Sequence, residues 1–297
     1  MGKWIPIFMV MLAAFCWGTG GVFTKMIVPF GFSSTDMVFI KSVVALFFLV
    51  LVNIRKGTKL FRINKFADLK YLTIVSLLGY VFYGAMFVLT VNEMGVGIGG
   101  AMLYTKCAFV IILERWIFQK KITAKKIFTV LLTITGCMGI AGLFSGAFEQ
   151  ITAKGLLFGF LSGVGFAIYD VMSKKVLDKN TSETVTFYTF FIASIVVGFI
   201  VHPLEILQVI MQNDLLPIVI LYGIVVSGLP YILYVWALSK IDAGIAAIVS
   251  TFELFTAVFA GRILYHEPLN IITICSMIAI LVAVLISNYT CQEIRNG

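Results

Sequence analysis

The stretch Gly97–Thr123, GIGGAMLYTKCAFVIILERWIFQKKIT, aligns without a gap on Gly244–Asn270, GIAAIVSTFELFTAVFAGRILYHEPLN. The offset between the two is 147 residues. Few letters are identical, but small and apolar residues follow the same pattern in both stretches. Where the charges differ they tend to differ in sign, so that Lys106 is opposite Glu253. The chain therefore reads as two copies of one unit.

The composition indicates a membrane protein, because 61% of the residues are hydrophobic and only 12% are charged. About a quarter of the residues of a soluble domain are charged. The apolar runs are continuous and near the length of about 20 residues that a membrane-spanning helix needs, whereas barrel strands alternate. We therefore expect an all-α membrane protein with five helices in each repeat, residues 1–146 and 147–297. The ten expected spans are about 4–28, 34–53, 71–91, 94–118, 126–145, 154–172, 184–201, 215–238, 244–264 and 269–289.

The distribution of positive charge predicts the orientation in the membrane. Most of the 22 Lys and Arg residues fall in alternate connections, as the positive-inside rule demands, so both termini are expected in the cytoplasm. The same rule accounts for the net charge of +8 without a nucleic-acid partner. Five spans per repeat would insert the second repeat upside down, which puts Lys120 and Lys240 inside and their counterparts Glu267 and Glu93 outside. Inverted repeats of this kind are typical of secondary transporters.

Charged residues inside the expected spans are the strongest candidates for function. Lys106 and Glu253 lie near the membrane midplane, where such residues usually face a partner or a cavity. They could form a buried ion pair that docks the two halves, or line a cavity and bind a substrate carboxylate and a substrate amine or proton. Lys41 could snorkel to the outer interface or serve as a further cavity cation. Asp170 lies one turn before Lys174, and we expect these two to pair at a helix end, with a proton site at Asp170 as the alternative.

Aromatic residues deep in the expected spans complete the candidate substrate-binding set. Tyr80 and Tyr83 lie in the third span, and Trp17 and Tyr231 lie in the first and eighth. A tyrosine offers a substrate both a ring face and a hydroxyl group. Packing against lipid or against other helices is the alternative role for each of them.

Local patterns predict three further features. Gly155, Gly159 and Gly163 form a stripe of small residues, which we expect to pack inside the monomer, with a dimer contact as the alternative. Pro230 should kink the eighth span. Its counterpart is Tyr83, so we expect the kink in the second repeat alone. The connection 202–214 is expected to form a short surface helix.

The sequence offers no motif for an enzyme, a metal site or a cofactor. The two histidines, His202 and His266, lie in expected outer connections and form no His-x-x-x-His pair. The glycine-rich stretch at residues 95–101 lacks the lysine of a phosphate-binding loop. We therefore expect neither catalysis nor a bound cofactor.

The chain resembles the ten-span form of the drug/metabolite transporter superfamily, which is built from two EamA domains. The first span, FCWGTGGVFTK, is similar to the opening Trp-Gly of that family, here Trp17 and Gly18, followed by Lys25. Lys41 occupies a position where the family often has arginine. The stretches LYTKCAFVIILERWIFQKKIT and STFELFTAVFAGRILYHEPL resemble the equivalent spans of its two halves, with Glu253 in one of the glutamate positions.

The chain departs from the family pattern in the fourth and ninth spans. Cys107 and Leu254 stand where the family commonly has proline, which leaves the expected kinks open. Lys120 replaces a glutamate, and Lys106 introduces an unusual charge on the cavity side. The resemblance implies export or exchange of small metabolites, often amino acids, through a central cavity.

Together these features predict a plasma-membrane transporter of small polar metabolites that works by alternating access around a midplane cavity. An amino acid would suit the two opposite midplane charges, and an organic anion bound at Lys106 is the alternative. A flippase for lipids or lipid-linked sugars and a structural membrane protein are rival functions. The expected partners are the substrate, membrane lipid and a proton as a candidate co-substrate, and the protein is expected to be a monomer or a homodimer.

Overall fold

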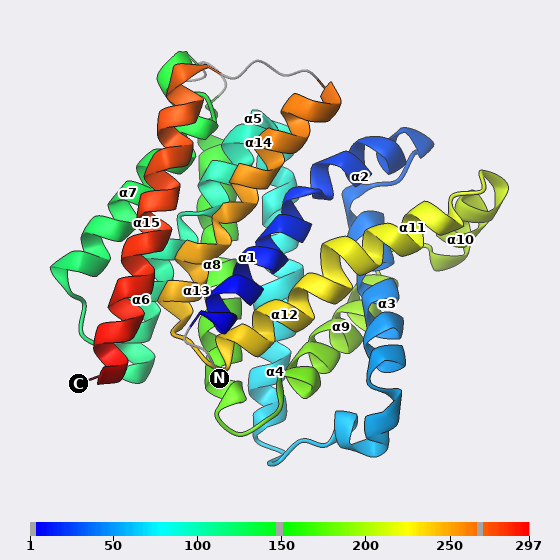
Figure 1. Ribbon diagram of the computed structural model, residues 1–297. Coiled ribbons are helices and arrows are strands. Elements are labelled where there is room, and N and C mark those ends of the chain that lie inside the picture. Colours follow the sequence, from blue (N-terminus) through cyan, green and yellow to red (C-terminus); the bar gives the residue numbers. More distant parts are fainter. Residues whose placement is uncertain (1–3, 147–150, 266–269, 297) are drawn as a thin grey trace.

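The computed structural model describes residues 4–146, 151–265 and 270–296, and in these ranges the chain forms helices, turns and short connections without a β-strand (Figure 1). The first half contains α1 (Ile5–Gly18), α2 (Gly20–Ile27), α3 (Ser34–Val52), α4 (Asp68–Ser76), α5 (Tyr83–Leu103), α6 (Lys106–Phe118) and α7 (Ala124–Ile140). The second half contains α8 (Ala153–Leu177), α9 (Ser182–Gly198), α10 (Pro203–Gln212), α11 (Leu216–Gly223), α12 (Leu229–Leu238), α13 (Ala243–Ser250), α14 (Phe252–Tyr265) and α15 (Ile271–Asn296). Short helices lie at Val28–Phe30, Ile54–Phe61 and Leu143–Ser145, and π-helical segments at Leu77–Phe82 and Ile224–Gly228.

Seven helical runs in the described part of the chain are long and apolar enough to cross a membrane. They are Ile5–Phe30, Ser34–Val52, Asp68–Gly95, Gly97–Phe118, Ala153–Leu177, Leu216–Leu238 and Ala243–Leu264. An eighth is added if α9 and α10, which meet at 96°, are taken as one span. An all-helical protein with many membrane spans is thus confirmed, whereas ten spans and inverted repeats stay predictions.

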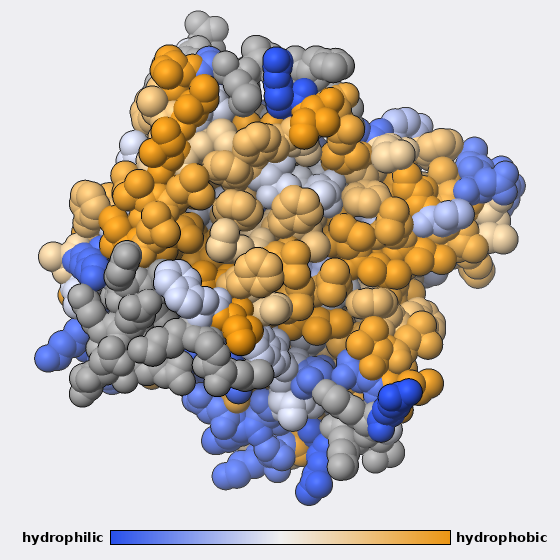
Figure 2. Space-filling view, in the orientation of Figure 1, coloured by the Kyte–Doolittle hydropathy of each residue, from blue (hydrophilic) through white to orange (hydrophobic). Residues whose placement is uncertain are grey.

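The helices form one bundle with apolar flanks. The first turn of α1 and the last turn of α15 lie at the same end, the lower one in Figure 1. Apolar side chains cover most of the visible flank, and hydrophilic residues gather at the lower end (Figure 2). The expected surface helix is present as α10, which buries Ile206 and Ile210 and leaves Leu204, Leu207 and Met211 exposed.

Several helices begin where the sequence supplies a hydroxyl cap. Ser33 caps α3 and forms a capping box with Asp36, and threonines cap three other long helices. Thr123, Thr152 and Thr181 accept a hydrogen bond from the backbone N–H three residues later at the starts of α7, α8 and α9. Such caps satisfy backbone groups that would otherwise lack partners at a helix end.

The two repeats share their helix irregularities. The π-helical segments begin at Leu77 and at Ile224, one repeat length apart. Helix irregularity is therefore common to both repeats, and the kink expected at Pro230 alone stays a prediction. Because a π-helical segment inserts an extra residue into a turn, it distorts the helix without any proline, and Tyr83 needs none in the first repeat.

Both repeats also carry an irregular turn, here called a helix break, at equivalent places inside one membrane-spanning run. The first break lies between α5 and α6 at Tyr104 and Thr105, within Gly97–Phe118. The second lies between α13 and α14 at Thr251, within Ala243–Leu264. The Oγ1 atoms of Thr105 and Thr251 donate to the carbonyls three residues earlier, at 2.7 and 2.6 Å. Side-chain bonds of this kind compete with the helix ladder and bend it. Threonine thus stands in for the proline that is missing at the neighbouring positions 107 and 254.

The glycine stripe packs inside the monomer, as expected. A Cβ atom on Gly159 would lie 2.7 Å from the side chain of Met102 on α5, and one on Gly155 would come closer still to Met94 on the same helix. A Cβ on Gly163 would collide with the Thr105 hydroxyl at the first break. Small residues therefore bring α8 into direct contact with the break that positions Lys106.

Candidate functional site

The two helix breaks meet at the centre of the bundle through Tyr104. Its hydroxyl donates to the carboxylate Oε2 of Glu253 at 2.6 Å and lies 3.1 Å from the carbonyl oxygen of Ser250. Lys106 is the first residue of α6, and Glu253 lies in the first turn of α14. Each repeat therefore presents a charged residue, placed just after its helix break, to the same region.

Residues one repeat apart also touch each other. The hydroxyls of Tyr80 and Ser227, both in π-helical segments, lie 3.4 Å apart, and their separation in sequence is 147 residues. One turn further, the hydroxyls of Tyr83 and Tyr231 are 2.9 Å apart. The two repeats therefore contact each other at the predicted tyrosines, through one pair of equivalent positions and one pair that is offset by a single residue.

Lys106 pairs with Asp170 and with no other carboxylate in the described part of the chain. The Lys106 Nζ atom lies 3.8 Å from Asp170 Oδ2, and both side chains are fully buried. Tyr234 donates to Asp170 Oδ1 at 2.8 Å. The expected pair of Asp170 with Lys174 is wrong, because Lys174 instead donates to the Leu238 carbonyl. Asp170 faces inward from α8, not along it.

Lys41 and Glu253 belong to a more accessible layer of the same site. Both are partly exposed, as is Tyr83. The ammonium of Lys41 lies 5.9 Å from the centre of the Tyr80 ring, and it interacts electrostatically with Glu253. Lys41 thus points toward the predicted site residues.

Aromatic rings connect these charges. Trp17 packs edge-on against Tyr231, with ring centres 5.3 Å apart, and Tyr231 lies 5.4 Å from Tyr80. Phe166 stacks on Tyr83 at 4.6 Å and covers the Lys106 ammonium, whose Nζ is 3.4 Å from the ring centre. All seven residues that the sequence singles out as candidates therefore fall in one connected group: Trp17, Lys41, Tyr80, Tyr83, Lys106, Tyr231 and Glu253.

The candidate set derived from the sequence omits the contribution of α8. Phe166, Tyr169 and Asp170 are buried and line the same group. A signal for Asp170 is present in the sequence, because it lies seven residues after Gly163 and so on the face of the glycine stripe. A carboxylate on a face that packs against other helices needs a buried partner.

A second cluster of charges closes the end of the bundle that is expected to be cytoplasmic. Glu114 at the end of α6 is buried and accepts from Lys120 at 3.1 Å and from the backbone N–H of Ala243 at 3.1 Å. Lys120 also bonds Asp242 at 2.5 Å, and Lys126 lies 3.7 Å from Glu114. We call these residues the end cluster: Glu114, Lys120, Lys126 and Asp242. It joins the two halves, whereas Glu267, the repeat counterpart of Lys120, lies outside the described residues.

Lys120 in the end cluster stays protonated over the physiological pH range. Burial by itself would lower the pKa of Lys120, but the carboxylates of Glu114 and Asp242 outweigh it and raise that pKa above its ordinary value. A raised lysine pKa adds stability that is fully present below the unfolded pKa, about 10.4, and is lost as pH rises through the folded value. The contribution of Lys120 is therefore lost only in strongly basic solution.

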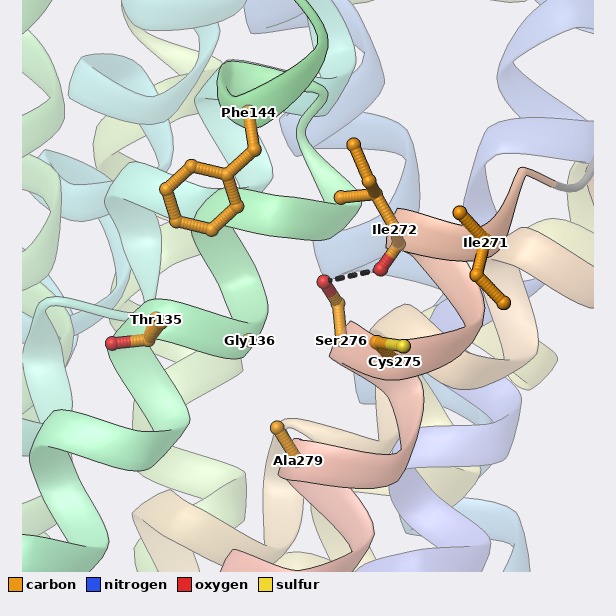
Figure 3. A pocket seen from close by; sticks show the side chains of 8 residues that line it. All are labelled: Thr135, Gly136, Phe144, Ile271, Ile272, Cys275, Ser276 and Ala279. Atoms are coloured by element: carbon orange, nitrogen blue, oxygen red, sulfur yellow. Dashed lines mark hydrogen bonds between the residues drawn. The ribbon is translucent and has the colours of Figure 1, made fainter.

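A cavity of about 310 Å³ lies away from the charged centre, between α7 and α15. Figure 3 shows Gly136 on α7 opposite α15, where the side chains of Ile272 and Ser276 lie on the side toward α7. Its lining is almost wholly apolar and includes none of the predicted site residues. Just beside it a Cβ on Gly136 would lie 2.8 Å from Ile280, so close packing separates this cavity from the site.

Comparison with known proteins identifies the family. The model described as "EamA-like transporter family" matches residues 4–142 and again residues 153–289. The chain belongs to this family. As the sequence patterns predicted, it carries two EamA repeats of the drug/metabolite transporter superfamily, and it is a multi-pass membrane transporter.

Two further proteins are similar to this EamA-like transporter. An "Uncharacterized transporter" of Clostridium kluyveri is 22% identical over 235 residues, which cover 77% of this chain and 75% of the relative. A solved structure described only as "Crystal structure of protein" superposes with a TM-score of 0.77 at 13% identity, covering 97% of this chain and 98% of the other. The second likeness shows that the fold is shared.

Proposed function

We propose that this EamA-like transporter moves small polar metabolites, with amino acids as the preferred class, by export or exchange across the plasma membrane. The carrying observation is that the equivalent irregular turns of the two repeats meet at one place, with opposite charges, Lys106 and Glu253, just after them. Irregular helices that meet between two repeats form the substrate sites of secondary transporters, where side-chain charges can contact the substrate. A zwitterion matches both signs at once.

The partly exposed residues and the buried Lys106 contact the substrate at different stages. Lys41, Glu253 and Tyr83 are partly exposed, so they meet a substrate first. Lys106 is fully buried beneath the rings of Phe166 and Tyr104, and it becomes available only after these rings move. Alternating access then requires the end cluster to open when the opposite side closes.

Neither rival function has a comparable observation behind it. A flippase needs a lateral path from lipid to the charged centre, and the α7–α15 cavity is apolar and ends against the close packing of Gly136. A structural protein needs no partly exposed charges at the centre, yet Lys41 and Glu253 are both partly exposed.

Transport by the reconstituted protein tests the proposal. We expect purified wild-type protein in proteoliposomes to exchange one or more radiolabelled L-amino acids, screened beside simple organic anions and uncharged solutes. Glu253→Gln and Lys41→Met should each reduce the flux about 10- to 100-fold, since each loses a charge-assisted contact worth about 1.5–3 kcal/mol. Lys154→Met is the matched control, because Lys154 is an exposed lysine at the start of α8.

The possible outcomes distinguish an error in the proposed function from an error in the proposed binding site. Absence of flux for every solute would sink the proposed function itself. Wild-type flux in both Glu253→Gln and Lys41→Met would instead show transport through a different site. Net flux of labelled lipid in the same vesicles, with no flux of soluble solutes, would favour the flippase.

A further inference from the structure

The buried pair of Lys106 and Asp170 is left short of hydrogen bonds. Within the described residues neither Lys106 Nζ nor Asp170 Oδ2 has a hydrogen-bond partner, and the same is true of the Tyr169 hydroxyl and the Ser173 hydroxyl on α8. Buried polar groups are normally bonded, and buried charges require it most. At 3.8 Å, Nζ and Oδ2 are close enough for an ion pair but too far apart for a hydrogen bond, so the N–H groups of Lys106 still lack an acceptor. A purely structural pair would be expected to close this gap.

The surroundings of Lys106 make a negatively charged partner necessary. Lys106 lies inside the membrane-spanning run Gly97–Phe118, and its side chain is fully buried. A charge inside a membrane-spanning helix needs a partner. The rings around Lys106 contribute cation–π contacts but no negative charge. Asp170 is thus the carboxylate that neutralises Lys106 in this conformation.

We propose that Asp170 is the proton-binding site of the transporter and that it competes with a substrate carboxylate for Lys106. The inference rests on the proposed function. A proton from water binds Asp170 Oδ2 and neutralises it, while Tyr234 remains bonded to Oδ1. Lys106 then carries an uncompensated charge, which a substrate carboxylate neutralises in place of Asp170. One proton crosses with each substrate, so an organic anion moves without net charge, whereas a zwitterionic amino acid moves with one net positive charge.

In this coupling Tyr104 and its hydrogen bond to Glu253 control access to Lys106. Tyr104 separates Lys106 from the accessible layer, because its ring lies 5.4 Å from Nζ while its hydroxyl is held by Glu253. Breaking that bond connects the two layers. Because the proton and the solute cross in the same direction, an inwardly directed proton gradient drives uptake of the solute, so the coupling replaces the proposed export by uptake and leaves exchange unchanged. The titratable groups that act on Asp170 are Lys106, Cys107 and Glu114 on α6, Tyr83 on α5, Tyr169 on α8 and Tyr234 on α12.

A measurement without substrate tests proton binding directly. Acid-induced infrared difference spectra of the reconstituted protein should show the carbonyl band of a newly protonated carboxyl group. We expect this band in wild type and in Glu253→Gln, and its loss in Asp170→Asn. The neutral double variant Lys106→Met/Asp170→Asn should lack it too, and it removes the risk that an unpaired buried lysine unfolds the single variant. A band that persists in the folded double variant overturns the proposal.

A second measurement tests the coupling with radiolabelled L-amino acids as the probe. One coupled proton permits up to about tenfold accumulation for each unit of pH gradient. We expect wild type to accumulate label toward this limit and Asp170→Asn to exchange label without accumulating it. Accumulation by Asp170→Asn equal to wild type would overturn the proton site while leaving the transport function intact. If wild type moves no solute at all, the proposed function fails, and the infrared result alone decides whether Asp170 takes up the proton.

Discussion

Replacing Gly79 with alanine is expected to destabilise the protein by about 1–3 kcal/mol, the usual cost of overpacking a filled core. A Cβ atom at this position would lie 2.7 Å from the Cα and 3.0 Å from the backbone nitrogen of Tyr169. Backbone atoms cannot rotate away, so α8 or the π-helical segment must shift. The measurement is the thermal unfolding temperature of the purified protein in detergent.

The matched control for this change lies one turn further along the same run of helix. A Cβ on Gly84 would meet only Val38 Cγ2, at 3.9 Å, so Gly84→Ala should unfold close to wild type. Because Tyr169 precedes Asp170, Gly79→Ala should also impair transport in any protein that still folds. Equal unfolding temperatures for the two variants would contradict the close approach of α8.

Removing the carboxylate of Glu114 is expected to have the second large effect, a loss of about 3 kcal/mol in the free energy of unfolding. This is the low end of the cost of breaking a buried ion pair, because Lys120 and Lys126 keep 28% and 10% of their side-chain surface exposed. The N–H of Ala243 also loses its acceptor. Glu114→Ala should therefore unfold well below wild type in the same thermal assay.

Two further variants separate the origins of that effect. Glu205→Ala removes an exposed glutamate from α10 and should be near neutral. Glu114→Gln keeps an acceptor for Ala243 but loses the charge, so it should fall between wild type and alanine. An unfolding temperature for Glu114→Ala within error of Glu205→Ala would show that the end cluster does not hold the halves together.

Sequence patterns predicted the helical membrane fold and the family because both depend on apolar length and on the repeat. They also predicted the central group, since charges such as Lys106 and Glu253 inside apolar helices must find partners. The number of spans does not follow as directly, because α7 has 17 residues and the described apolar part of α15 is Ile271–Ile286. Both stretches are shorter than the roughly 20 residues that a membrane-spanning helix usually needs.

The partner of Lys106 could not be deduced from local spacing. Asp170 and Lys174 have the separation of a pair on a helix surface, which favoured the wrong assignment. The partner choice is set by the rotation of α8, and this depends on the contacts of its glycines with Met94, Met102 and Thr105. The helix breaks were equally hidden, because threonine side chains produce them and threonine is common in unbroken helices as well.

The contact between Tyr80 and Ser227 has a consequence for the origin of the molecule. In a symmetric dimer of identical half-length chains, a residue on the twofold axis meets its own copy, so both must have the same size and charge. A fused gene removes that restriction. A large side chain can then face a small one at the axis, and a lysine on one half can correspond to a glutamate on the other. The ability to bind both ends of a zwitterion is thus open to a fused chain in a way that it is not to a pair of identical ones.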